Sequence, residues 1–241
     1  MTQKNTTIGL LGSKGRMGQL VSKLLAEEFT RDATFAAQAD RGGAIDSLLG
    51  VDVVIDFSTP EAMVALAQNA LSASGALPAF VIGSTGWKID DKRVIEVLAE
   101  KTPILMSSNF STGVLALLSI LRQASPLLEK LGYTPVVVET HHKHKKDAPS
   151  GTAISIQRAI APAGPGNIQT HSVRAGEVIG DHEVAFYGSG DHITLGHFAQ
   201  DRSIFARGAI EAALWLAAKK KSAALKNGLV GIETFFGENT R

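Results

Sequence analysis

The sequence predicts an α/β protein, in which a parallel sheet with helices on both faces is followed by a smaller α+β part. Over the first 108 residues, short apolar runs alternate with helical patterns, and this rhythm favours parallel strands joined by helices. After Asn109 the pattern changes to a longer helix and glycine-punctuated extended runs. With 44% hydrophobic and 20% charged residues, the composition is that of an ordinary globular protein.

The first part contains five short apolar runs that we expect to be buried strands, because Gly, Asp or Ser bounds each of them. They cover residues 7–12, 34–40, 52–58, 79–84 and 103–107. Helical patterns lie between them at 17–29, 60–72 and 90–101. The second of these helices opens with a proline, and the third begins with acidic residues and ends with lysine, as the helix dipole favours.

In the second part we expect a helix at 112–131, a strand at 133–140 and a helix near 151–161. The segment 170–199 consists of extended runs separated by GD and GSGD turns, which favours antiparallel neighbours. A final helix is predicted at 203–220. The loop around 107–112 is the cleanest domain boundary.

Composition also excludes several classes of function. The net charge is +1, so the molecule is not expected to bind nucleic acid. The absence of cysteine excludes disulfides, thiolate nucleophiles and cysteine-based zinc sites. The first apolar run is too short to span a bilayer and lacks the features of a signal peptide, so we expect a cytoplasmic protein without a membrane partner.

A glycine-rich turn lies where the first strand should meet the first helix. Gly12, Gly15 and Gly18 follow a G-x-x-G-x-x-G spacing, which differs from the G-x-G-x-x-G dinucleotide fingerprint by placing Lys14 in the middle position. Glycine allows a tight turn and a close approach to a pyrophosphate, which the free N–H groups of the helix would face. The alternative is an ordinary glycine-rich turn without a ligand.

The end of the second strand supports the dinucleotide interpretation. Asp40 lies 22 residues after the last of these glycines, where a carboxylate can bind the ribose hydroxyls of NADH. The adjacent Arg41 could instead pair with the 2′-phosphate of NADPH, so we expect either cofactor to be used. Gly83, Thr85 and Gly86 end a later strand and could approach the cofactor, or could form an ordinary turn.

The segment ETHHKHKKDAPSGTA, residues 139–153, contains three of the chain's seven histidines and three lysines. A metal site is disfavoured because the lysines would repel a cation. A nucleic-acid or localisation patch has little support from one short basic run, and a solvated loop is the ordinary alternative.

A fourth interpretation is a site for an anionic substrate that must be protonated. The lysines attract carboxylates, and a bound carboxylate favours the imidazolium form of a nearby histidine, which then acts as a general acid. Ser150 is a good N-cap, and Gly151 and Thr152 open a helix whose free N–H groups hold a carboxylate well.

The pattern E-x-H-H-x-x-K-x-D-x-P-S-G-T-A resembles the signature of the dihydrodipicolinate reductase family, also called 4-hydroxy-tetrahydrodipicolinate reductases. GSKGRMG, VIGSTGW, SSNFSTGV and SVRAGEVIGDHEV are similar to the family's other landmarks, in the same order. The resemblance implies a Rossmann-like dinucleotide-binding domain at 1–108, to which 209–241 return, and a substrate-binding and tetramerisation domain at 109–208. It also implies reduction of a small cyclic imine dicarboxylate by NADH or NADPH in lysine and diaminopimelate biosynthesis, without a metal, in a homotetramer.

By position, the resemblance implies that His141 is the catalytic acid and that Lys145 is a second catalytic group, a proton donor or electrostatic stabiliser. It assigns the substrate carboxylates to His142, Gly151 and Thr152. It assigns the cofactor to Gly12, Lys14, Gly15, Arg16, Met17, Asp40, Arg41, Gly83, Thr85, Gly86, Ser108, Asn109 and Phe110. Lys14 departs from the family, which usually has a small residue there.

Other polar residues have ordinary interpretations. Arg174 and Arg202 could contact a carboxylate, but structural roles are favoured. His182, His192 and His197 are expected to be surface or satisfied histidines. Two other functions stay open, another two-domain NAD(P)-dependent dehydrogenase acting on a small dicarboxylate and a non-catalytic dinucleotide-binding regulator, although neither explains the histidine and lysine segment.

Overall fold

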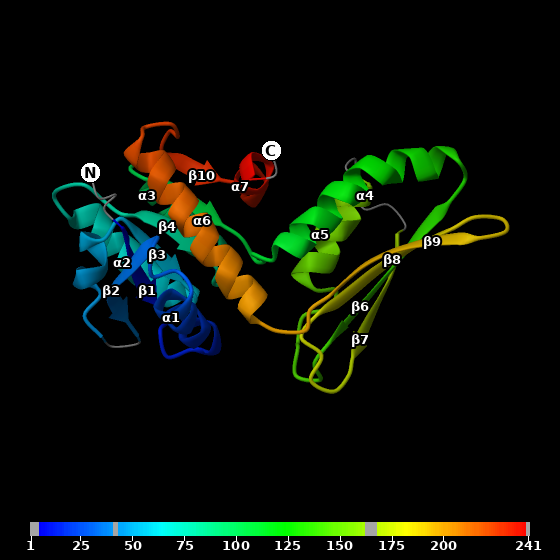
Figure 1. Ribbon diagram of the computed structural model, residues 1–241, viewed down its shortest axis with the longest axis horizontal. Coiled ribbons are helices and arrows are strands. Elements are labelled where there is room, and N and C mark those ends of the chain that lie inside the picture. The colour runs from blue at the N-terminus through cyan, green and yellow to red at the C-terminus, as the bar shows by residue number, and fades with distance from the viewer. Residues whose placement is uncertain (1–4, 41–42, 162–167, 240–241) are drawn as a thin grey trace. The chain divides into compact units, whose positions relative to one another are not determined.

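The protein divides into two compact units in the computed structural model, which describes residues 5–40, 43–161 and 168–239 (Figure 1). The first unit takes residues 1–110 and 203–241, and the second takes residues 111–202. The chain therefore leaves the first unit after Phe110 and re-enters it at Ser203. Arg41, the predicted partner of a cofactor phosphate, lies outside the described residues.

The first unit is built on a six-stranded parallel sheet of order β10-β5-β4-β3-β1-β2, which confirms the α/β prediction. The strands are β1 (Thr6–Leu11), β2 (Ala33–Ala39), β3 (Val53–Asp56), β4 (Ala79–Ile82), β5 (Pro103–Met106) and β10 (Gly228–Val230). Five of them lie within or next to the predicted apolar runs. The expected burial is wrong for β2, which lies at the edge of the sheet and is mostly exposed. β10 has no predicted counterpart, because three residues are too few to show a periodic pattern.

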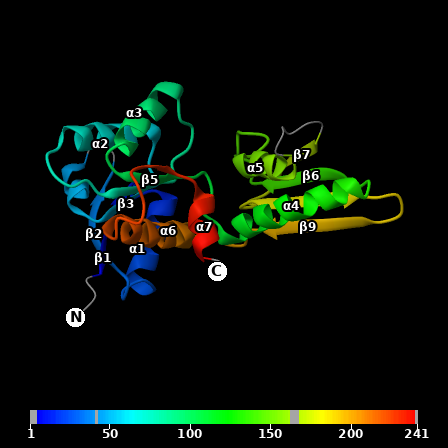
Figure 2. The ribbon, with the colours of Figure 1, turned by 90° about the horizontal axis from the view of Figure 1, so that it is seen from above.

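Helices cover both faces of this sheet, as Figure 2 shows. On one face, α2 (Pro60–Ser72) and α3 (Ile89–Ala99) bury their apolar residues with those of the strands in one core. On the other face, α1 (Arg16–Glu27) packs beside α6 (Ser203–Lys221), which crosses the central strands. The short 3₁₀ helix η1 (Asp46–Gly50) follows β2, and α7 (Ile232–Asn239) follows β10.

The second unit is a mixed four-stranded sheet of order β7-β6-β8-β9. Its strands are β6 (Thr134–His141), β7 (Gln169–Arg174), β8 (Asp181–Tyr187) and β9 (His192–Phe198). Its helices, α4 (Thr112–Lys130) and α5 (Gly151–Ile160), pack together and share a core with one face of the sheet. The described part of this unit thus has the α+β character that the sequence predicts.

The predicted antiparallel pairing of neighbours in 170–199 is wrong for β7. β8 and β9 do pair antiparallel across the GSGD turn, but β7 pairs in parallel with β6, on the side away from β8. α5 lies between β6 and β7 in the chain, and a helix that connects two strands favours their parallel pairing. The GD turn before β8 was therefore a weaker signal than this helix.

Among the described residues of this unit, no helix covers the other face of the sheet. Val136, Val138 and Thr140 alternate along β6 with buried residues and are only partly buried. Val173 and Phe198 share this face by register with Thr140, directly on β7 and through β8 on β9, and both are exposed. One side of the second unit is therefore an open and partly apolar sheet surface.

Candidate active site

Close backbone contacts shape the glycine turn between β1 and α1. Gly12 has φ of +87°, and a Cβ there would lie 2.8 Å from backbone atoms of Phe57. A Cβ on Gly18 would lie 2.1 Å from the carbonyl oxygen of Gly12. Glycine at both positions lets α1 begin directly against the end of β1, as a dinucleotide-binding turn requires.

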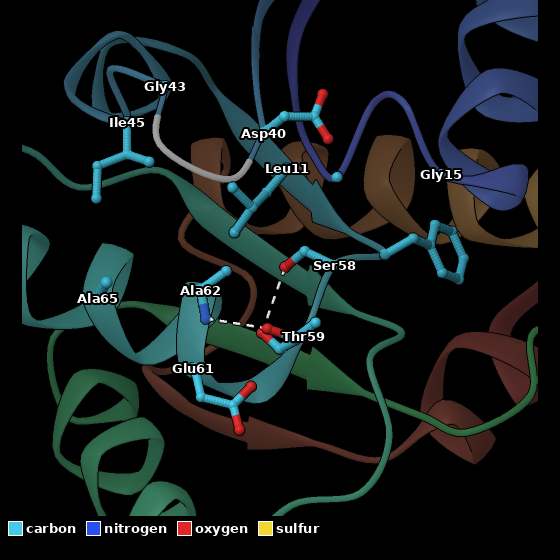
Figure 3. Close-up of a pocket in the computed structure, with 12 residues that line it drawn as sticks. Leu11, Gly15, Asp40, Gly43, Ile45, Ser58, Thr59, Glu61, Ala62 and Ala65 are labelled. Atoms are coloured by element: carbon cyan, nitrogen blue, oxygen red, sulfur yellow. Dashed lines mark hydrogen bonds between the residues drawn. The ribbon is translucent and has the colours of Figure 1, made fainter.

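A cavity of about 760 Å³ lies at the carboxyl ends of β1, β2 and β3 (Figure 3). β1 lies between β2 and β3, so the connections diverge here, and open α/β sheets bind their ligands at such a point. Three predicted cofactor residues line the cavity, Gly12, Gly15 and Asp40. Ser58 and Thr59, which were not predicted, line it from the loop that leads into α2.

Asp40 is hydrogen-bonded to the glycine turn. Its Oδ2 accepts from Ser13 Oγ at 2.6 Å and from the backbone N–H of Lys14 at 3.0 Å. The carboxylate therefore lies beside the turn in the cavity wall, where hydroxyl groups of a ribose can reach it. The side chains of Lys14 and Arg16 are exposed. The cavity, the glycines and the carboxylate together fit a dinucleotide.

A buried carboxylate links two loops at this edge of the sheet. Asp56, the last residue of β3, is fully buried and accepts hydrogen bonds from Ser58 Oγ and Ser84 Oγ, each at 2.5 Å. Burial raises the pKa of Asp56, and the serine hydrogen bonds oppose this rise. Asp56 thus connects the loop after β3 with the loop after β4, which holds the predicted residues Gly83, Thr85 and Gly86.

Two of the remaining predicted cofactor residues, Gly83 and Phe110, pack against the ring of Phe57. A Cβ on Gly83 would lie 2.3 Å from the ring of Phe57, so this glycine makes room for that ring. Phe110 is buried, and its ring meets Phe57 edge-on with centroids 6.1 Å apart. Phe110 is therefore a packing residue in this structure, while the preceding Ser108 is exposed and Asn109 is partly buried.

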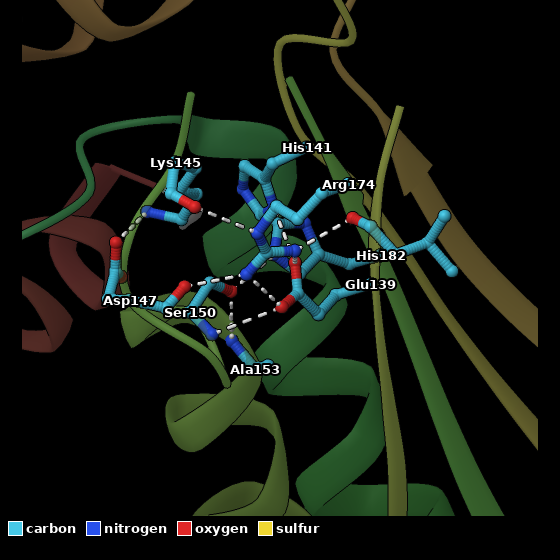
Figure 4. Close-up of polar contacts among 9 residues, drawn as sticks. Glu139, His141, Lys145, Asp147, Ser150, Ala153, Arg174 and His182 are labelled. Carbon is cyan, nitrogen blue, oxygen red and sulfur yellow. Dashed lines mark hydrogen bonds and ion pairs between the residues drawn. The ribbon is translucent and has the colours of Figure 1, made fainter. Parts of the chain in front are cut away.

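The second group of predicted residues surrounds the end of β6 (Figure 4). Glu139 and His141 are two residues apart on the strand, so both point to its helix-covered face, and both are buried. Nδ1 of His141 is hydrogen-bonded to Oε2 of Glu139. The catalytic histidine that the sequence assigns therefore has a buried carboxylate directly behind it.

Arg174 holds the other side of this carboxylate. It lies opposite His141 in the register of β7 and β6, and its two terminal nitrogens reach Oε2 and Oε1 of Glu139 at 3.0 and 2.8 Å. The same guanidinium donates to the carbonyl oxygens of Asp147 at 2.6 Å and Lys145 at 3.3 Å. Arg174 thus fixes both Glu139 and the loop after β6.

The first turn of α5 joins the same network. Ser150 is the N-cap, and its Oγ accepts from the backbone N–H of Ala153 at 3.1 Å. Its own backbone N–H donates to Oε1 of Glu139 at 3.3 Å. Ser150 Oγ also lies 3.1 Å from Nε2 of His182, whose ring meets that of His141 edge-on with centroids 5.1 Å apart.

His182 differs from its predicted character as a surface or satisfied histidine. Its side chain is 3% exposed, and its Nδ1 has no hydrogen-bond partner among the described residues. Strand alternation explains the burial, because His182 lies opposite Glu139 in the register of β8 and β6 and so faces the helices. The GD turn before it gave no sign that the strand would begin inside the core.

Burial and charge set the protonation states of these groups. Burial alone would raise the pKa of Glu139, but hydrogen bonds from Arg174, Ser172 and His141 outweigh it and lower the pKa to about 2. Burial lowers the pKa of His141 despite the neighbouring Glu139, and it lowers the pKa of His182 to about 4. At neutral pH the network therefore holds an ionised carboxylate beside two neutral imidazoles.

The remaining predicted substrate residues lie on the loop after β6 and at the start of α5. Nζ of Lys145 pairs with Oδ1 of Asp147 at 2.9 Å. Gly151, the first residue of α5, is exposed, and His142 and Thr152 are partly buried. Sequence reasoning gave Glu139 no role and favoured a structural role for Arg174, although the two-residue spacing from Glu139 to His141 at the end of the predicted strand was a usable signal.

Two findings on the described residues concern metal binding and membrane insertion. Among these residues, no group of three or more His, Cys, Asp or Glu side chains is arranged so that it could hold a metal ion. In the same ranges, none of the helices combines the length and the apolar character that crossing a bilayer requires.

Comparisons with known proteins agree with this geometry. Family models described as "Dihydrodipicolinate reductase, N-terminus" and "Dihydrodipicolinate reductase, C-terminus" match residues 6–110 and 113–233. A 4-hydroxy-tetrahydrodipicolinate reductase of Caulobacter vibrioides is 39% identical over 88% of this chain and 92% of its own length. One of Zymomonas mobilis is 38% identical over 90% and 94% of the two chains.

Solved structures share the fold. A dipicolinate-bound dihydrodipicolinate reductase from Paenisporosarcina sp. TG-14 has a TM-score of 0.72 at 22% identity and covers 95% of this chain and 98% of that one. An engineered D-amino acid dehydrogenase bound to NADP+ has a TM-score of 0.55 at 13% identity, with 97% and 96% of the two chains covered. With matching family models over both units and close relatives along most of its length, this chain belongs to the dihydrodipicolinate reductase family.

Proposed function

We propose that this protein reduces 4-hydroxy-tetrahydrodipicolinate to tetrahydrodipicolinate with NADH or NADPH, the 4-hydroxyl group leaving as water, in lysine and diaminopimelate biosynthesis. The observation that carries the proposal is the buried His141, backed by Glu139 and placed beside the first turn of α5. A proton donor next to free helix N–H groups suits a dicarboxylate that is protonated as it is reduced. The family membership of the chain supports the same reaction.

The first unit holds the nicotinamide cofactor in this proposal. Gly12, Gly15 and the first turn of α1 would approach the pyrophosphate, and Asp40 would accept the ribose hydroxyls. When bound, the dinucleotide supplies the hydride. Gly83, Thr85, Gly86 and residues 108–110 are proposed for the remainder of the cofactor, as are Lys14, Arg16, Met17 and Arg41.

The second unit binds and protonates the substrate. The N–H groups of Gly151 and Thr152 at the start of α5, with His142, would hold the carboxylates. The pKa of His141 lies below its ordinary value, so the imidazole is neutral until carboxylates bind nearby and favour its protonation. The ammonium of Lys145, which pairs with Asp147, would then stabilise negative charge near the ring nitrogen.

We also propose that the open sheet face of the second unit forms the contacts of a homotetramer. Its partly apolar surface, with Val173 and Phe198 exposed, is not covered by either of the helices that the structure describes in this unit. Val173→Glu should yield smaller species in size-exclusion chromatography with light scattering, whereas unchanged mass would exclude this face as the interface.

A coupled assay tests the proposed reaction. NADH or NADPH oxidation should require the cyclic imine that forms from aspartate semialdehyde and pyruvate, and loss of absorbance should cease without it. His141→Gln and Lys145→Ala should lower kcat, by about 10²- to 10⁴-fold for the general acid, while cofactor binding is kept. His144→Gln, an exposed histidine in the same loop, is the matched control.

Two results would favour the alternatives. If no level of enzyme oxidises the cofactor with this imine while the cofactor still binds, a regulator or a dehydrogenase for another dicarboxylate is the better description. Arg41→Ala separates the two cofactors, because loss of a 2′-phosphate partner should weaken NADPH more than NADH. Equal weakening would remove Arg41 from the phosphate site.

A further inference from the structure

We propose that Glu139 is a positioning residue that keeps a proton on Nδ1 of His141, so that Nε2 delivers the proton, and that ties this imidazole to the first turn of α5. The inference rests on the proposed function, because it names how the proton donor of that reaction is oriented. Glu139 itself is fully buried behind His141 and is not placed to touch the substrate. Its role is therefore exerted through the histidine and the helix.

The orientation of the imidazole follows from its two neighbours. Nδ1 faces the carboxylate of Glu139, which accepts but cannot donate a hydrogen bond when ionised. Nδ1 must then carry a proton, and the neutral ring leaves Nε2 free to gain and release a second one. On the Nε2 side lies Gly180, where even a Cβ would approach Nε2 to 3.0 Å, so glycine keeps that nitrogen unobstructed.

Glu139 also connects the proton donor with the helix terminus. One oxygen, Oε2, faces His141, and the other, Oε1, accepts from the backbone N–H of Ser150, the residue immediately before the proposed carboxylate ligands. A carboxylate bound at Gly151 and Thr152 is thereby held at a fixed distance from the imidazole. This arrangement favours loading of His141 by the substrate that it protonates.

The surrounding charges define the expected pH behaviour of His141. Glu139 favours its imidazolium form, whereas Lys145 of the loop and Arg174 of β7 oppose it. His182 of β8 packs against its ring, and Asp147 of the loop pairs with Lys145. Removing the charge of Glu139 should therefore shift the titration of His141 to lower pH, and removing that of Arg174 should shift it to higher pH.

The experiment compares Glu139→Gln with Arg174→Gln in the full-length protein. For Glu139→Gln we expect the alkaline limb of the kcat–pH profile to move about one unit lower, so that kcat on that limb falls about tenfold, with the dissociation constant of NADH unchanged. Arg174→Gln should move the limb upward. Glu177→Gln, a carboxylate in an exposed pair with Lys143, is the matched control and should not move it.

Nitrogen-15 NMR of the histidines gives a readout that does not depend on turnover. The His141 signals, assigned by their loss in His141→Gln, should show Nδ1 protonated in the wild type, and their titration should move downward in Glu139→Gln. Since Glu139→Gln leaves the guanidinium of Arg174 without the carboxylate that balances its charge, the double variant Glu139→Gln/Arg174→Gln serves if the single variant does not fold. It is then compared with Arg174→Gln alone.

The inference is supported if the titration of His141 shifts in opposite directions in the two single variants. It is also supported if His141 titrates at lower pH in the double variant than in Arg174→Gln. Loss of kcat without any shift in the limb or in the titration overturns it and leaves Glu139 a purely structural residue. If the wild type does not reduce the cyclic imine, the proposed function fails, but the NMR titration still decides whether Glu139 holds the proton on His141.

Discussion

The stability of this protein should depend on pH through His182. Burial lowers the pKa of this histidine from 6.5 to about 4. At pH values between these two, the folded state therefore binds fewer protons than the unfolded state. The stability that depends on a neutral His182 is complete above pH 6.5 and is lost as the pH falls towards 4. His182→Gln removes the titrating ring but keeps an amide that can bond Ser150 Oγ, which lies 3.1 Å from the ring nitrogen.

The two pKa values give the size of the effect. Lowering the pKa from 6.5 to about 4 corresponds to at most about 3 kcal/mol. Only part of it is expressed between pH 8 and pH 5, where the linkage relation gives about 2 kcal/mol. Glu139, whose pKa is lowered from 4.5 to about 2, loses its contribution only below this range and does not confuse the comparison.

Urea unfolding followed by circular dichroism at pH 8 and pH 5 measures the effect at a fixed protein concentration. The difference in free energy of unfolding between wild type and His182→Gln should change by about 2 kcal/mol between the two pH values, in favour of the variant at pH 5. His144→Gln, at an exposed histidine, is the control. A wild-type to His182→Gln difference that is the same at both pH values would refute the reasoning.

Three further predictions concern the two sites. Asp56→Asn replaces one of the two carboxylate oxygens that accept from Ser58 and Ser84 with an NH2 group, which can only donate, and so weakens the link between the loops after β3 and β4. Steady-state kinetics should show a several-fold higher KM for NADH with kcat nearly unchanged; a loss confined to kcat would contradict it. Gly18→Ala places a Cβ against the carbonyl of Gly12 and should lower the free energy of unfolding by at least about 2 kcal/mol, whereas Gly50→Ala, with open space around it, should not. Ser150→Ala removes the N-cap of α5 and should cost about 1 kcal/mol in urea unfolding and raise the KM of the imine; an unchanged midpoint would show that the cap adds nothing.

Much of the fold could be predicted because its signals are local. The five strands predicted for the first unit are short apolar runs, and α2 begins at the proline that a first turn favours, with Thr59 capping it. The placement of β7 could not be predicted in this way. Whether a strand pairs with its predecessor or its successor depends on the whole sheet, and the turn residues before β8 carry no information about it.

The candidate site divides along the same line. His141, Lys145 and Gly151 belong to one continuous segment, so a sequence pattern was enough to single them out. Arg174 lies 33 residues after His141 in the chain and reaches Glu139 only because β7 returns beside β6 in parallel. His182 arrives from β8 on the opposite side of β6. Sheet register therefore brings together the parts of the site whose contact partners the sequence pattern could not indicate.

Stability alone does not explain why Glu139 and Arg174 form an ion pair with its carboxylate fully buried and its guanidinium largely buried. Taking both charges out of water costs free energy that their attraction only partly returns, and well-packed apolar side chains often serve a core equally well. Here, however, the carboxylate has other partners besides the guanidinium, the Nδ1 of His141 and the backbone N–H of Ser150. An apolar pair could hold β6 against β7, but it could neither keep a proton on Nδ1 nor fix that imidazole to the start of α5. The proposed proton donation by His141 would account for the pair, and the opposite shifts expected for Glu139→Gln and Arg174→Gln test it.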